Sequence, residues 1–154
     1  MIEKKYKMEN QLTILISTIA AAISAIFAAV SSIMTYSQYR KERLQKLNDR
    51  LDKILEIGIQ YPYVENANFI SRWVEMKDSQ DEQYLRYDMY CNLLFNYLVA
   101  VYDYYNGDKN KIENFVDVKS WVRLHQLNWK YPVDPNENID GYSLEFRNFI
   151  NSYI

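Results

Sequence analysis

The chain has 154 residues, of which 16% are aromatic, and its 18 basic and 20 acidic side chains leave a net charge of -2. This length allows one small domain with its own core, and the aromatic content argues against a disordered chain. The single cysteine, Cys91, excludes an intrachain disulfide and agrees with a reducing cytoplasm, while the single histidine, His125, excludes a metal site built from several histidines.

The first predicted element is a membrane-spanning helix. Residues 12–34 are 23 residues without a charge, a proline or a glycine, and about 18 such residues already indicate a span. At about 1.5 Å per residue the run is roughly 34 Å long, against a hydrocarbon core of about 30 Å. We therefore expect one crossing within residues 11–36, capped by Asn10 or Thr13, after a short polar N-terminus (1–10) that is too short to fold.

A cleaved signal peptide is the competing interpretation of this segment. Lys4, Lys5 and Lys7 form a basic stretch before the apolar run, as in a signal peptide. However, the run is longer than the roughly 7–15 residues of a signal-peptide core, and a basic helix follows it in place of a cleavage site. We therefore favour an uncleaved anchor.

Small residues recur at every fourth position on two neighbouring ridges of the span. This spacing lets two helices in lipid approach closely, whereas the opposite face is rich in Ile and suits lipid. Two interpretations stay open: self-association through the ridges, or chance in a span rich in Ala and Ser that lacks glycine. The ridge residues are Ser17, Ala21, Ala25 and Ala29, and Ala20, Ser24, Ala28 and Ser32.

The basic residues around the span predict its orientation. Three Lys residues precede it, and six Lys and Arg residues follow it within residues 40–53; the side richer in Lys and Arg stays in the cytoplasm. We expect a single-pass protein of a bacterial inner membrane, with the 118 residues after Tyr36 in the cytoplasm. The candidates to bind anionic lipid headgroups are Arg40, Lys41, Arg43, Lys46 and Arg50, each contributing about 1 kcal/mol near the surface.

A basic helical stalk is predicted over residues 37–59. No helix breaker occurs between Tyr36 and Gly58, so the helix should run on through Ile57. An apolar stripe along it has the spacing of three and four residues that a coiled coil requires. The stripe either forms a short coiled coil with a second chain or packs on the chain's own distal domain. Its members are Leu44, Leu47, Leu51 and Ile54.

The rest of the chain, residues 60–154, is predicted to be an aromatic-rich all-α domain, a bundle of about four to five helices. Pro62 should end the stalk. A first helix over residues 64–77 should bury Phe69, Ile70, Trp73 and Val74 on one face.

The longest helix should run from Glu82 to Asn106. It is apolar around most of its circumference, which is typical of a central helix, and Gly107 should end it. Shorter helices are expected over 108–115, 118–128 and 143–153, with a loop at 132–141. The predicted N-caps are Ser79 or Asp81, then Asp108, Asp117 and Ser143.

Charge argues against nucleic acid as a partner. Residues 54–154 contain nine basic and fifteen acidic side chains, a net charge of -6. A nucleic-acid surface needs an excess of Lys and Arg to neutralise phosphates. The expected partners are therefore membrane lipid, another protein and a second copy of the chain.

His125 lies four residues from both Trp121 and Trp129. On one continuous helix these three side chains would share a face. They could then form an aromatic surface for a partner, or they could be a histidine packed between two core tryptophans, which is the more ordinary arrangement.

The sequence contains no pattern typical of a catalytic, cofactor or metal site. Its three glycines are scattered at predicted helix ends and form no phosphate-binding loop. An acidic corner has oxygen ligands of the kind that Mg²⁺ or Ca²⁺ prefers, but its spacing matches no EF-hand. We therefore expect solvated, helix-capping carboxylates there, with no metal and no cofactor. The corner consists of Glu75, Asp78, Asp81 and Glu82, with Asp88 further along.

Three hypotheses of function follow. The leading one is a non-enzymatic, membrane-anchored adaptor or scaffold whose helical domain binds another protein. The second is a membrane-perturbing effector or toxin-like protein of a bacterial defence system, an analogy of layout only. The third is an enzyme that uses His125 and nearby carboxylates.

Overall fold

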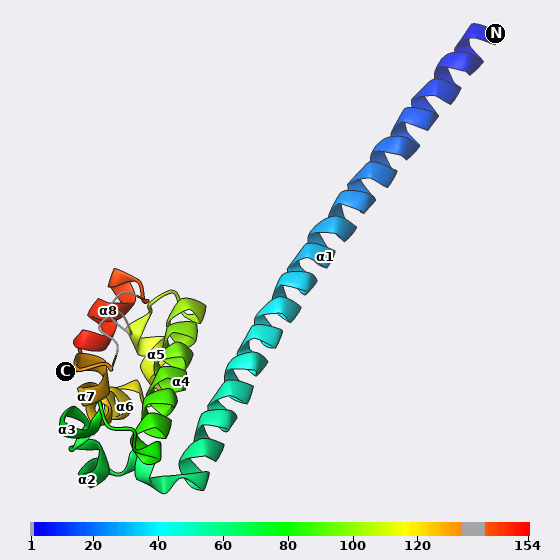
Figure 1. The fold of residues 1–154 in the computed structure, drawn as a ribbon. Helices are drawn as coiled ribbons and strands as arrows, with labels where there is room; N and C mark the ends of the chain where they lie inside the picture. The colour runs from blue at the N-terminus through cyan, green and yellow to red at the C-terminus, as the bar shows by residue number, and fades with distance from the viewer. Residues whose placement is uncertain (1, 134–140) are drawn as a thin grey trace. The chain divides into compact units, whose positions relative to one another are not determined.

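The computed structural model describes residues 2–133 and 141–154, and every regular element in these ranges is helical (Figure 1). The predicted all-α fold is confirmed for these residues. The chain divides into two compact units, residues 1–44 (unit 1) and residues 45–154 (unit 2), which are described separately.

Unit 1 is the N-terminal part of α1 (Ile2–Gln60). This helix begins at Ile2, so the prediction of an unfolded N-terminus with a cap at Asn10 or Thr13 is wrong. Both residues lie inside the helix, because nothing in the polar lead breaks it: proline and glycine, the residues that cost a helix most, are absent there. Among the described residues, α1 is the one helix that is long and apolar enough to cross a membrane.

Unit 2 begins inside α1. Leu47 and Ile54 have only 5% and 3% of their surface exposed and belong to the hydrophobic core, and Leu51 and Ile57 pack against it. Within the predicted stalk (residues 37–59), the stripe residues Leu47, Leu51 and Ile54 therefore pack on the chain's own distal domain, which is one of the two arrangements that the sequence left open.

Three short elements occupy the place of the predicted helix over 64–77. They are η1 (Pro62–Glu65), α2 (Ala67–Ile70) and α3 (Trp73–Met76). The prediction of one helix is wrong because Asn66 adopts an extended backbone and its side chain accepts the N–H groups of Asn68 and Phe69, starting a new helix. Phe69, Ile70 and Trp73 are buried as predicted, whereas Val74 is exposed.

The long helix α4 (Glu82–Tyr104) has the predicted caps. Asp81 accepts the backbone N–H groups of Gln83 and Tyr84 at 2.9 and 3.3 Å. After the helix ends, Gly107 has a φ of +72° and donates its N–H to the carbonyl of Tyr102. A Cβ at this position would lie 2.9 Å from the ring of Tyr102, so both the conformation and the space require glycine.

α4 is the central helix of unit 2, as its pattern predicts. Nine of its side chains are buried, and aromatic pairs connect it to α2, α3, α7 (Gln126–Lys130) and α8 (Leu144–Asn151). Rings at these separations attract each other beyond the area that they bury. The pairs, with distances between ring centroids, are Phe69–Tyr84 at 4.2 Å, Trp73–Tyr87 at 5.3 Å, Phe95–Trp129 at 4.8 Å and Tyr102–Phe149 at 5.1 Å.

The remaining elements are α5 (Lys109–Phe115), α6 (Val118–Leu124), α7 and α8. The predicted caps Asp108, Asp117 and Ser143 each accept a backbone N–H group. The predicted single helix over 118–128 is wrong, because it is interrupted at His125. Most of the predicted loop at 132–141 lies outside the described residues.

Candidate functional site

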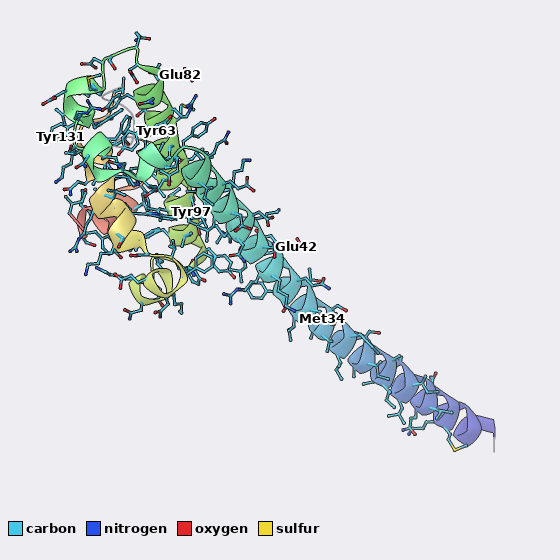
Figure 2. The ribbon with its side chains drawn as sticks, turned by 90° about the horizontal axis from the view of Figure 1, so that it is seen from below. Met34, Glu42, Tyr63, Glu82, Tyr97 and Tyr131 are labelled. Atoms are coloured by element: carbon cyan, nitrogen blue, oxygen red, sulfur yellow. The ribbon has the colours of Figure 1, made fainter. Side chains whose placement is uncertain are left out.

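The large apolar side chains of residues 12–34 are exposed. All of them are between 48% and 69% exposed, and Figure 2 shows side chains standing out from α1 on the N-terminal side of Met34. The small-residue ridges are exposed along the same segment, including Ala25 and Ala29. The structure therefore leaves both faces of this helix open to a bilayer or to another helix.

The hydroxyl groups on the ridges are satisfied within the helix. Ser17 donates to the carbonyl of Ile14, and Ser24 and Ser32 donate to Ala20 and Ala28, at 2.8–2.9 Å. A hydroxyl bonded in this way carries no unpaired donor into hydrocarbon. The ridges therefore offer small size, and not free polar groups, to a second helix.

The predicted headgroup-binding residues are all exposed along α1, from Arg40 to Arg50. Sequence reasoning missed two tyrosines that come just before them. Tyr36 and Tyr39 are 65% and 56% exposed, and the Arg43 guanidinium lies 5.9 Å from the ring of Tyr39. The signal was available, because tyrosine directly after an apolar segment is typical of a membrane–water interface.

The Trp121–His125–Trp129 set does not form one surface. His125 has no exposed area and Trp129 is 5% exposed, while Trp121 is partly buried. Because the helix is interrupted at His125, the three residues do not share one continuous helical face. His125 is buried, as in the more ordinary alternative, but its ring packs on Tyr87 and Tyr90, with both pairs of ring centroids 5.7 Å apart, and not between two tryptophans.

His125 is instead the centre of a buried polar cluster that sequence reasoning did not find. The Tyr87 hydroxyl and the Cys91 thiol both approach its Nδ1 atom, at 3.1 and 3.8 Å. Its Nε2 atom lies 3.4 Å from Glu65 Oε1 but forms no hydrogen bond with a described residue. The Tyr90 hydroxyl donates to the same Glu65 oxygen.

Two opposing effects act on the pKa of Glu65. Burial is the largest and raises the pKa, but the interactions with His125 and Tyr90 outweigh it and hold the pKa below its usual value. Burial likewise raises the pKa of Tyr87, Tyr90 and Cys91, so these three groups keep their protons. The cluster therefore places the Glu65 carboxylate beside the neutral Tyr90 phenol, and the neutral Tyr87 phenol and Cys91 thiol beside Nδ1 of His125.

The cluster has the three groups of a nucleophilic catalytic triad: an orienting acid (Glu65), a base (His125) and a nucleophile (Cys91). Two features oppose catalysis there. Neither Cys91 nor His125 has exposed surface that a substrate could reach, and burial keeps the thiol protonated, whereas the thiolate is the nucleophile. In this conformation the cluster can anchor η1 to α4 and to the α6–α7 junction.

The acidic corner is used for local structure. Asp81 caps α4, Glu82 forms an ion pair with Arg86, and Asp88 accepts a hydrogen bond from Asn128 at 2.9 Å. In residues 2–133 and 141–154, no three His, Cys, Asp or Glu side chains lie close enough together to hold a metal ion. The carboxylate nearest His125 is Glu65, which is not part of this corner.

The class that the described residues define is an all-α protein with one apolar helix near its N-terminus. Comparisons with protein-family models, with curated proteins and with solved structures find no match to this chain. Proposals about its function therefore rest on its own residues.

Proposed function

We propose that this chain is a single-pass protein of a bacterial inner membrane, anchored by residues 12–34, with unit 2 as a small helical bundle in the cytoplasm. One observation carries the proposal: the large apolar side chains of this segment are all between 48% and 69% exposed. Soluble monomers rarely expose an apolar surface of this extent, and a bilayer would cover it. The excess of Lys and Arg after the segment favours the cytoplasmic orientation.

We further propose that unit 2 binds another protein and performs no catalysis. An apolar strip on α4 supports this role: Leu85, Met89 and Leu93 are spaced by four residues and are 43%, 63% and 47% exposed. Residues at this spacing share one face of a helix, and such a face can lie in the groove of a partner. The burial of Cys91 and His125 argues against an enzyme.

A pull-down of the full chain in mild detergent, followed by mass spectrometry, tests the protein-binding role. Met89→Glu places a charge in the centre of the strip and should remove the partner. Leu144→Glu is the matched control, because Leu144 is similarly exposed, at 59%, but lies on α8. A partner that is retained by both variants, or lost by both, would contradict binding through the α4 strip.

The second candidate, a membrane-perturbing effector, is favoured by the exposed small-residue ridges. Expression of the full chain would then arrest growth and depolarise the membrane, and Ala25→Ile should relieve both effects. The larger side chain would hold two helices apart and remove their close packing. Ile23→Leu, on the face rich in Ile, is the control and should leave the effects unchanged. Harmless expression of the unaltered chain would exclude this candidate.

The anchor and its orientation are tested together. A reporter that is active only in the cytoplasm, fused after Ile154, should be active. The intact mass of the membrane-extracted protein should include residues 1–34, because we propose an uncleaved anchor. A mass that lacks this segment would identify a signal peptide, and a reporter active only in the periplasm would reverse the orientation.

Self-association is tested by single-cysteine cross-linking in native membranes. After Cys91→Ala, the substitution Ala25→Cys places a thiol on a ridge, whereas Ile23→Cys places one on the opposite face. We expect cross-linked dimers from position 25 and few from position 23. Equal cross-linking, or none at either position, would mean that the ridges result from composition alone.

A further inference from the structure

A small cavity lies within unit 2, where the last turns of α1 run beside α4. Its volume is about 270 Å³, and Figure 2 labels one of its residues, Tyr97, on α4 next to α1. We call this cavity the α1–α4 groove. Its lining residues are Arg50, Lys53 and Ile54 from α1, and Leu93, Asn96 and Tyr97 from α4.

The walls of the α1–α4 groove are largely apolar. Ile54 is 3% exposed and forms part of the core, whereas Leu93 is 47% exposed although it lines the groove. An apolar ligand that covered Leu93 would remove this area from water, which is favourable. The groove therefore suits a ligand with an apolar part.

The charged residues of the groove are both positive. Arg50 has no ion-pair partner within residues 2–133 and 141–154, and Lys53 is paired with Glu56 at 3.1 Å on the exposed side of α1. Among the residues that the structure describes, no carboxylate lines the groove. A guanidinium without a partner at the edge of an apolar cavity is complementary to a carboxylate, which it can bind through two parallel hydrogen bonds.

Tyr97 is the most deeply buried residue that lines the groove. Its side chain is 2% exposed, and its hydroxyl has no accessible surface and no hydrogen-bond partner among the described residues. A ligand in the groove therefore does not reach this hydroxyl in the present conformation. The ring of Tyr97 adds apolar surface to the groove beside Ile54 and Leu93.

Asn96 can add to the same recognition. Its Oδ1 atom accepts the Tyr142 hydroxyl at 3.2 Å, which leaves its amide N–H groups as further donors at the groove. The donors that line the groove are thus the Arg50 guanidinium, the Lys53 ammonium and the Asn96 amide, beside apolar surface from Ile54 and Leu93.

We propose that the α1–α4 groove binds a small anionic amphiphile, a single short acyl chain with a carboxylate head. The chain would lie against Ile54 and Leu93, and the carboxylate would bind Arg50 and the donors beside it. A volume of about 270 Å³ is below the roughly 300–1,000 Å³ of typical ligand pockets, so a lipid with two full chains does not fit. The site shares Leu93 with the α4 strip of the proposed protein-binding role, but Met89, the residue that tests that role, does not line the groove, so either proposal can fail alone.

Photo-crosslinking of the full chain tests the proposal. The protein is held in an amphipathic polymer, so that no free detergent competes, and is exposed to a decanoate analogue that carries a diazirine on its chain. Mass spectrometry then locates the label. We expect label on the peptides that contain residues 50–54 and 93–97, and excess decanoate should remove it. Decanol and decyltrimethylammonium have the same chain with a neutral or cationic head, and they should compete at least about tenfold less well, because they lose a charge-assisted hydrogen bond.

Variants connect the label to the groove. Arg50→Gln should reduce labelling of the groove by about tenfold, and Lys53→Gln should also reduce it. Tyr97→Phe keeps the ring and should leave labelling within about twofold, because a ligand in the groove does not reach the buried hydroxyl. Lys46→Gln is the matched control, since Lys46 is an exposed cation on α1 that does not line the groove. Each of these outcomes would overturn the proposal: label confined to residues 12–34, equal competition by all three heads, or an Arg50→Gln variant that behaves like Lys46→Gln.

Discussion

The fragment of residues 45–154 should fold on its own, whereas the fragment of residues 60–154 should be severely destabilised or unfolded. Both fragments contain every element from η1 to α8. They differ in the segment of α1 that carries Leu47 and Ile54, which are buried in the core of unit 2. The comparison therefore isolates what this segment contributes to folding.

The magnitude follows from burial. Complete burial of a Leu or Ile side chain stabilises a protein by about 1.5–3 kcal/mol, so the loss of Leu47 and Ile54 alone removes roughly 3–6 kcal/mol. Leu51 and Ile57, which pack against the core, add to this loss. The total stability of a domain is usually about 5–15 kcal/mol. The shorter fragment should therefore lose a large part of its stability.

Urea unfolding, followed by tryptophan fluorescence, measures the difference. The reporters Trp73, Trp121 and Trp129 are present in both fragments. In the longer fragment, Ile54→Ala should cost about 2–5 kcal/mol, whereas Leu55→Ala, at a residue that is 47% exposed, should cost much less. If residues 60–154 unfold at the same urea concentration as residues 45–154, the α1 segment is not part of the folding unit.

Three further predictions concern the interior of unit 2. Because folding lowers the pKa of Glu65, its charge stabilises the fold above the unfolded pKa of 4.5, and this contribution is lost as the pH falls through the lower folded pKa. Glu65→Gln should therefore lower the free energy of unfolding at pH 7, and the difference between the variant and the unaltered chain should shrink below about pH 4. Glu75→Gln, at an exposed residue, is the control. A difference that is constant from pH 7 to pH 3 would contradict the charged state of Glu65. Leu94→Ala, at a side chain without exposed surface, should cost about 2–5 kcal/mol in urea unfolding, and an effect no larger than that of Leu85→Ala, which is 43% exposed, would refute the central place of α4. Gly107→Ala should lower the midpoint of thermal unfolding, because it combines a φ of +72° with a Cβ 2.9 Å from Tyr102; an unchanged midpoint would show that this turn relaxes freely.

Local signals were enough to predict much of unit 2. Caps such as Asp81, Asp108 and Ser143 act on backbone groups two or three residues away, so the sequence contains both partners of each interaction. The apolar face of α8 is equally local, since residues at spacings of three and four meet on one side of a helix. These features follow from the chain without knowledge of its tertiary fold.

The errors occurred where a side chain has two roles that only the fold distinguishes. Asn66 reads as a tolerable helix residue, but its side chain caps α2 and ends η1. His125 fits a helical pattern with two tryptophans. Its ring nitrogens, however, lie close to Tyr87 and Glu65, which are 38 and 60 residues earlier in the chain. Partners so distant in sequence leave no periodic signal. The buried cluster was therefore not predictable from spacing, although each of its residues was visible.

The burial of the Leu47 and Ile54 side chains also restricts how two copies of this chain can associate. A coiled coil through the α1 stripe would need these side chains, which already lie in the core of unit 2. Moving them to a second helix would bury the same apolar area again, so the gain from burial nearly cancels. The exchange would also expose the core surface that Leu47 and Ile54 now cover. This exposure would destabilise unit 2, as the removal of a buried side chain does. The ridges of residues 12–34, whose small side chains are exposed and are not part of the core, carry no such cost, which is why the proposed self-association is assigned to them and not to the stripe.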